Sequence, residues 1–154
     1  VPVIAAGGIC DGPSMAAAFA LGAEGVQMGT RMVAAAEAPV HQNWKQAILA
    51  ASETDTVFLN RFSRPGLRAL RTQKTTALER QEHVGFEVFA TVQDLYFGGD
   101  MEASIALAGQ VVGRIEAVKP VAEIIAETVA GFRATVARLA DHGAPRDRPS
   151  PSGR

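Results

Sequence analysis

The stretch VIAAGGI (Val3–Ile9), followed after 17 residues by QMGTR (Gln27–Arg31), decides the fold expected of this chain. Each stretch belongs to a short apolar segment that ends in glycine, which is typical of a buried strand. Between them, Asp11 and Pro13 provide a helix cap and a first-turn proline, and Gly22 ends the apolar helix that follows. A strand, a short helix and a second strand in this order predict a parallel β-α-β unit.

The two glycine-terminated strand ends predict a phosphate site. In a parallel unit the carboxyl ends of neighbouring strands meet at one edge, where free N–H groups and the helix dipole attract anions. Glycine lets the backbone approach a phosphate without an intervening Cβ, and (β/α)₈ barrels hold phosphate in the loops after strands 7 and 8. An isolated Gly-Gly pair is better explained as a strand terminator. Two such ends one unit apart favour phosphate bound by Gly7, Gly8, Gly29 and the Thr30 hydroxyl.

Composition excludes several classes of function. The 154 residues fit one domain, and a net charge of −1 with 20% charged residues argues against a nucleic-acid partner. One cysteine cannot form an intramolecular disulfide, and zinc-type spacing of Cys and His is missing, so no metal site is expected. The longest mostly apolar stretch, Met15–Leu21, is too short to cross a membrane, so we expect a cytoplasmic protein without membrane contact.

The rest of the chain is expected to be mainly helical. A helix is predicted from about Pro39, a strand over 56–62, and helices over 101–118 and 120–140. The helix over 101–118 is predicted from the helical spacing of Ile105, Ala108, Val112 and Ile115. The basic excess of residues 61–80 is interpreted as a solvated helix face in preference to a ligand surface.

Several segments resemble one enzyme family. AAGGICDG (residues 5–12) and ALGAEGVQMGTR (residues 20–31) strongly resemble the FMN-dependent nitronate monooxygenases, formerly called 2-nitropropane dioxygenases. The resemblance covers roughly residues 1–130. It continues through Glu37–His41, Lys45–Ile48, Ala51–Thr56 and Ala108–Gly113.

This resemblance implies an α/β fold, namely the C-terminal part of a TIM-type (β/α)₈ barrel with an added helical segment. It implies noncovalent FMN and oxidation of a small-molecule nitronate by oxygen to a carbonyl compound and nitrite. Homo-oligomerisation is left open. The first phosphate loop is carried over onto Ala6, Gly7 and Gly8, and the second onto Gln27, Gly29 and Thr30. A position like Ala6 can be serine in the family, so alanine here leaves only backbone donors.

The catalytic base is not expected in this chain, because the family's usual catalytic histidine lies upstream. We therefore assign no catalytic residue and expect these residues alone to be inactive. His41, His83 and His142 are interpreted as surface or helix-packing residues, and Cys10 as a small packed residue.

Four segments are expected along the chain. Residues 1–56 would form the last barrel strands and the phosphate site. Residues 57–118 would form a helical cap over the flavin, with Gly109 and Gln110 nearest the cofactor and lining the substrate pocket. Residues 119–142 would form a helix on the barrel wall, and residues 143–154 a disordered tail. Because the chain opens directly on a strand, we expect it to be the last part of a larger domain.

Three alternative functions remain. A flavin-dependent enoyl-acyl-carrier-protein reductase would share the barrel and the phosphate site, and the sequence does not cleanly separate it from a nitronate monooxygenase. Barrels of the inosine-monophosphate dehydrogenase type are disfavoured by Glu53–Thr56 and by the region around Gly109 and Gln110. A noncatalytic remnant would bind only phosphate or a partner protein.

Overall fold

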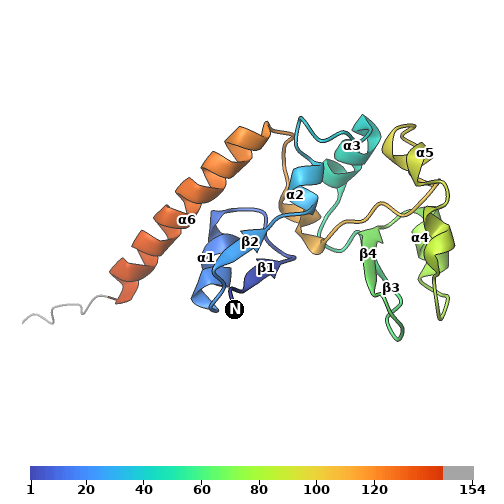
Figure 1. Ribbon diagram of the computed structural model, residues 1–154. Coiled ribbons are helices and arrows are strands. Elements are labelled where there is room, and N and C mark those ends of the chain that lie inside the picture. Colours follow the sequence, from blue (N-terminus) through green and yellow to red (C-terminus); the bar gives the residue numbers. More distant parts are fainter. Residues whose placement is uncertain (144–154) are drawn as a thin grey trace, which may run out of the picture.

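The computed structural model describes residues 1–143, which form a mixed α/β structure with two small sheets (Figure 1). The predicted tail lies outside the described residues except for Gly143, which ends the last helix. The elements in chain order are β1 (Ile4–Ala6), α1 (Gly12–Ala20), β2 (Gly25–Gln27), α2 (Thr30–Val33), α3 (Gln42–Ala50), β3 (Thr56–Leu59), β4 (Leu67–Leu70), α4 (Gln73–Leu78), the 3₁₀ helix η1 (Phe86–Phe89), α5 (Val92–Tyr96), the 3₁₀ helix η2 (Gln110–Arg114) and α6 (Val121–Gly143).

The predicted β-α-β unit is present. β1 and β2 are parallel neighbours, with Ala6 opposite Gln27 at their carboxyl ends. Asp11 caps α1, because its Oδ1 accepts a hydrogen bond from the Ser14 backbone N–H at 2.8 Å. The expectation of a buried first strand is wrong, since Ile4 is 56% exposed. Among the described residues β1 has a hydrogen-bonded neighbour on one edge only, which leaves this side chain uncovered.

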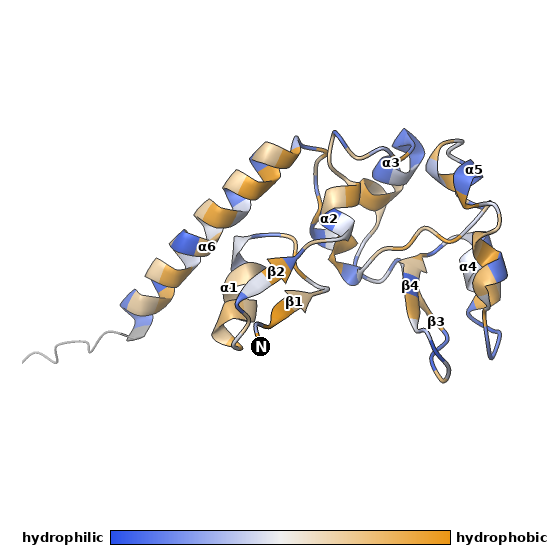
Figure 2. Cartoon of the chain, in the orientation of Figure 1, coloured by the Kyte–Doolittle hydropathy of each residue, from blue (hydrophilic) through white to orange (hydrophobic). Residues whose placement is uncertain are grey.

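The long helix α6 packs against α1, and it confirms the helix predicted over 120–140. The two backbones approach closely where Gly12 faces Gly131, since a Cβ built on Gly12 would lie 2.2 Å from the Gly131 carbonyl carbon. The rings of Phe19 and Phe132 meet nearby, with their centroids 5.2 Å apart. In the hydropathy view α6 alternates apolar and polar patches along its length (Figure 2).

Residues 57–118 are only partly helical, because they include an antiparallel hairpin that the sequence reasoning missed. β3 pairs with β4, with Thr56 opposite Leu70 and Leu59 opposite Leu67. The predicted strand over 56–62 is therefore present but ends at Leu59, where Asn60 turns the chain with a φ of 57°. The hairpin packs on a hydrophobic cluster whose buried residues are Val57, Leu59, Ala69, Val84, Val88 and Ile105.

The predicted helix over 101–118 is wrong. Most of this segment has no regular secondary structure, with the short η2 as its one helical turn, and the Ala108 N–H donates to the Arg68 carbonyl of β4. The residues that suggested a helix are nevertheless buried, including Ile105 and Val112. Their spacing matched a helical period, but these side chains enter two different clusters, Ile105 from an irregular stretch and Val112 from η2.

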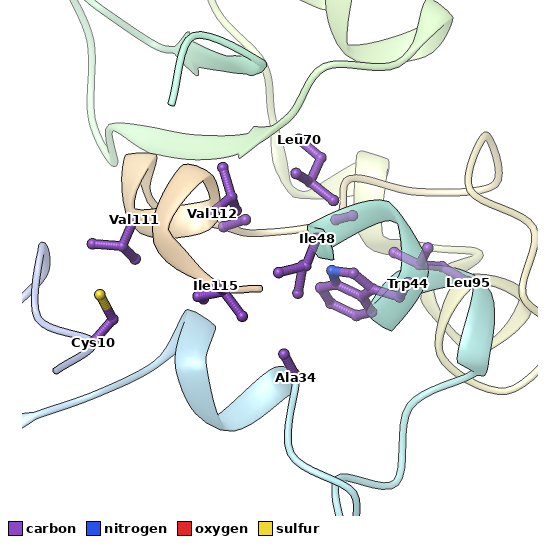
Figure 3. Packing of buried hydrophobic residues seen from close by; sticks show 11 residues of the cluster. Cys10, Ala34, Trp44, Ile48, Leu70, Leu95, Val111, Val112 and Ile115 are labelled. Atoms are coloured by element: carbon purple, nitrogen blue, oxygen red, sulfur yellow. The ribbon is translucent and has the colours of Figure 1, made fainter. Parts of the chain in front are cut away.

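A second hydrophobic cluster joins the β-α-β unit to the rest of the chain. Figure 3 shows Trp44 and Ile48 of α3 facing Val112 of η2, with Ile115 between them and Cys10. α3 starts at Gln42, later than the predicted start near Pro39, because His41 serves as its N-cap. This cluster holds η2 against the loop that follows β1 and against the end of α2. None of the helices in residues 1–143 combines the length and apolar character needed to cross a bilayer.

Candidate functional site

The glycines that follow β1 and β2 form an open cradle, by which we mean Gly7, Gly8 and Gly29. The register of Ala6 opposite Gln27 places the two strand ends side by side. Gly7 and Gly8 have φ angles of 91° and 75°, a backbone region that other residues rarely adopt. A Cβ built on any of the three cradle glycines would meet no atom within 4 Å, so their missing side chains leave free space.

The cradle offers backbone donors. Among the backbone hydrogen bonds of loops, turns and helix caps in residues 1–143, none has the N–H of Gly8, Ile9 or Gly29 as its donor. Ala6 and Gln27, the last residues of the two strands, are both exposed at this edge. Unpaired N–H groups beside an open backbone can bind an anion.

Thr30 links this edge to the distant part of the chain. Its Oγ1 accepts a hydrogen bond from the Gly109 N–H at 2.9 Å. A hydroxyl oxygen that accepts such a bond still has its own proton to donate. Thr30 is half-buried and directly follows Gly29, the cradle glycine after β2.

Residues 109–119 run alongside α2, and hydrogen bonds hold them there. The Arg31 guanidinium donates to the Ala117 carbonyl at 2.9 Å, and the Ala36 N–H donates to the Lys119 carbonyl at 2.9 Å. Gly109, which was expected to lie nearest the cofactor, contacts Thr30 directly through its N–H. Gln110, the other expected pocket residue, begins η2 with an exposed side chain.

Arg114 is a residue of this site that the sequence reasoning missed. It ends η2, and its guanidinium lies 2.5 Å from Oδ2 of Asp11, the residue that caps α1. Arg114 also lines the same hollow as Gly7 and Gly8. The contact joins positions 103 residues apart, so sequence spacing gives no sign of it. The available signal was a single cation in the otherwise uncharged stretch Gly109–Ile115.

The buried ionisable groups near the cradle have structural roles. Burial raises the pKa of the Cys10 thiol, so this side chain remains a protonated, packed residue, as expected from the sequence. Burial also lowers the pKa of Arg31, whose side chain is 7% exposed. The region of the chain that the structure describes contains no group of three His, Cys, Asp or Glu residues arranged to hold a metal ion.

Two of the three histidines, His41 and His83, contact residues near them in the structure. Nδ1 of His41 accepts the Asn43 N–H at 3.1 Å and so caps α3. Nδ1 of His83 lies 3.1 Å from the Ser63 hydroxyl. His142 is exposed near the end of α6.

The basic residues of 61–80 lie mostly on a hairpin and its flanks, so the expectation of one solvated helix face is wrong. Arg68 of β4 lies over the Phe58 ring at 5.2 Å, which is a cation–π contact. Arg71 forms an ion pair with Glu79 at 3.1 Å. These two cations stabilise the hairpin and its junction with α4.

These observations define a class: an α/β protein whose parallel strand-helix-strand unit ends in an open glycine cradle. The chain belongs to the nitronate monooxygenase family, because the model of that family, described as "Nitronate monooxygenase", matches residues 1–131. A probable nitronate monooxygenase of Staphylococcus haemolyticus is 39% identical over 82 residues, which are 53% of this chain and 23% of the relative. The resemblance inferred from the sequence is therefore confirmed.

Several solved structures are similar to this chain, and two of them bear on its fold and function. FabK from Thermotoga maritima is 41% identical with a TM-score of 0.84, over 92% of this chain and 47% of that one. Nitroalkane oxidase from Streptomyces ansochromogenes is 23% identical with a TM-score of 0.71, over 90% of this chain and 41% of that one, and so shares the fold. The chain spans less than half of either structure and about a quarter of the curated relative.

Proposed function

We propose that this chain is the FMN-phosphate-binding part of a nitronate monooxygenase, which oxidises alkyl nitronates to carbonyl compounds and nitrite with oxygen. The observation that carries the proposal is the open glycine cradle at two parallel strand ends in a chain of this family. In this proposal β1 and β2 are the last two strands of a (β/α)₈ barrel, and the preceding strands come from residues outside this chain.

The residues of the cradle fit a phosphate group. Gly7 and Gly8, with Ala6 before them, form the first phosphate loop, and their lack of side chains leaves room for phosphate oxygens. Gln27, Gly29 and Thr30 form the second loop. The oxygen of the Thr30 hydroxyl accepts a hydrogen bond from Gly109, and the hydroxyl proton is still available to donate to the phosphate. FMN, when bound, supplies the redox chemistry, and these residues orient it through its phosphate.

Residues 57–118 act as the cap that shapes the substrate pocket in this proposal. Support comes from the hydrogen bond between Gly109 and Thr30, which ties the end of this segment to the second phosphate loop. Gln110 follows with an exposed side chain that is free to contact a small nitronate. The base that removes a proton from a neutral nitroalkane lies outside this chain, in keeping with the local contacts of His41 and His83.

A flavin-dependent enoyl-acyl-carrier-protein reductase is the second candidate. It is supported by the similarity to FabK, which extends over 92% of this chain at 41% identity, whereas the curated nitronate monooxygenase matches 53% of it. The two candidates share the cofactor site and differ in the reductant and in the substrate that reaches the pocket.

The decisive experiment compares two reactions in the complete protein that carries these residues. Purified protein loaded with FMN is given propyl-2-nitronate and oxygen, and nitrite release and oxygen uptake are measured. A parallel sample receives NADH or NADPH with an enoyl thioester, and loss of nicotinamide absorbance is measured. Nitrite release without thioester reduction supports the first proposal. Thioester reduction without nitrite release supports the second, and a protein with neither activity contradicts both.

A further inference from the structure

The open glycine cradle contains no cationic side chain, although a phosphate monoester carries close to two negative charges. Phosphate sites commonly add a guanidinium, whose planar donors match two phosphate oxygens. Two arginines lie close in the structure to the loops that follow β1 and β2. Arg31 follows Thr30 directly, and Arg114 reaches the first loop from η2.

Arg31 is not available to a ligand in the cradle. It is 7% exposed, and its Nη1 donates to the Ala117 carbonyl at 2.9 Å. It lines a small cavity with Cys10 and Asp11 and with Glu127 and Thr128 of α6, and none of the three cradle glycines lines this cavity. Its role is to hold residues 109–119 beside α2.

Arg114 has the opposite character. Its side chain is 51% exposed and is the one charged group that lines the hollow containing Gly7 and Gly8 in residues 1–143. Asp11 holds the guanidinium through Oδ2, while its Oδ1 accepts from the Ser14 N–H and hydroxyl. Asp11 accepts a hydrogen bond from Nη2 of the guanidinium. The other N–H groups of Arg114 can therefore donate to a second acceptor.

We propose that Arg114 is a ligand of the phosphate monoester held by the glycine cradle, with Asp11 as the residue that positions its guanidinium. The inference rests on the proposed function in that the phosphate is the one of FMN. η2 then has a second purpose, because it brings Gly109 to Thr30 at one end and Arg114 to the first loop at the other.

A structural role and a ligand role of Arg114 predict different outcomes. If the pair with Asp11 only stabilises the fold, Asp11→Asn and Arg114→Gln remove the same ion pair and have the same effect. If Arg114 binds phosphate and Asp11 positions it, Asp11→Asn keeps the guanidinium charge and loses only its positioning, so this variant weakens FMN binding less than Arg114→Gln does. Asparagine also keeps the cap of α1, because it is as good an N-cap as aspartate.

The test measures dissociation constants of FMN and of riboflavin, which lacks the phosphate, by flavin fluorescence on the apo form of the complete protein. Arg114→Gln should weaken FMN binding by about 10- to 100-fold and leave riboflavin binding unchanged, as expected for a lost charged hydrogen bond. Arg114→Lys should recover part of the loss, and Asp11→Asn should weaken FMN binding by a clearly smaller factor than Arg114→Gln. Arg138→Gln, at an exposed arginine of α6, is the matched control and should match wild type.

Three results would overturn the assignment. Equal weakening of FMN and riboflavin by Arg114→Gln would make Arg114 a structural residue. Unchanged FMN binding in Arg114→Gln would show that the phosphate does not contact it, while the proposed function stands. A wild-type protein that binds neither flavin would overturn this proposal together with the proposed function, and circular dichroism of each variant identifies loss of fold as a separate cause.

Discussion

The residues that matter most at the candidate site are those without side chains. Gly7 and Gly8 have positive φ angles, and a Cβ on either would project into open space, which the phosphate fills in the proposed function. A substitution there therefore strains the backbone and fills the cradle at once. Gly29 has no positive φ, so at this position a substitution would act only by filling the open space.

The double substitution Gly8→Val and Gly29→Val should abolish flavin retention in the complete protein. Positive φ at Gly8 costs a branched residue about 1–2 kcal/mol, and both valine side chains would occupy the cradle. The measurement is the flavin content after gel filtration, read from the visible absorbance.

The control for this prediction is Gly22→Val, because Gly22 has a φ of 99°, equally open surroundings and a place in the turn after α1. It should reduce stability by a similar amount and leave the flavin content of the folded protein unchanged. Full flavin retention in the double variant would refute the phosphate assignment.

The helices and strands that depend on short-range sequence patterns were predicted correctly. The cap at Asp11 and the glycine-ended strands are short-range patterns, and β1, α1 and β2 follow them. The helix expected over 101–118 failed because Ile105 and Val112 recur at helical spacing while the backbone bonds to β4, a partner that the spacing does not reveal. Arg114 was missed for a related reason, since its partner Asp11 is 103 residues away.

The crossing of α1 and α6 depends more on Gly12 than on Gly131. A Cβ on Gly12 would lie 2.2 Å from backbone atoms of α6, whereas a Cβ on Gly131 would lie 3.3 Å from the Gly12 Cα. Gly12→Ala should destabilise the protein by about 2 kcal/mol through overpacking. Gly131→Ala should change stability by less than about 1 kcal/mol, because better helix propensity offsets the tight contact.

Thermal unfolding midpoints of the two alanine variants, measured beside wild type in the complete protein, test this asymmetry. Similar midpoints for both variants would mean that the two helices separate easily at this point, and that the close approach of Gly12 and Gly131 contributes little.

The segment that contains η2 makes a separate prediction for catalysis. If residues 57–118 form the cap, Gln110→Ala should raise KM or lower kcat by about 3- to 30-fold, the range for a lost hydrogen bond, and leave flavin content intact. Gln46→Ala, at an exposed position of α3, is the control and should be kinetically silent. The measurement is steady-state kinetics with several nitronates. Unchanged KM and kcat for all of them would mean that this segment contributes only to packing and not to the substrate pocket.

At the scale of the whole molecule, the free edges of the small sheet β1–β2 decide how residues 1–154 behave as an isolated polypeptide. In the described part of the chain each of these strands has the other as its one hydrogen-bonded neighbour, and Val3, Ile4 and Leu21 are each more than half exposed beside them. Unpaired strand edges next to exposed apolar side chains promote association between chains.

We therefore expect the isolated polypeptide to self-associate and to release no nitrite from nitronates. It contains the glycine cradle, whereas His41 contacts Asn43 and His83 contacts Ser63, so neither is placed as a base in the proposed function. Light scattering after size-exclusion chromatography measures the first property, and a colorimetric nitrite assay with added FMN measures the second. A monomeric, cooperatively unfolding preparation that releases nitrite would contradict both, because the cradle and cap alone would then suffice for turnover. If the isolated polypeptide self-associates and still binds FMN, the residues of the cradle suffice for binding. Catalysis would then need residues beyond them.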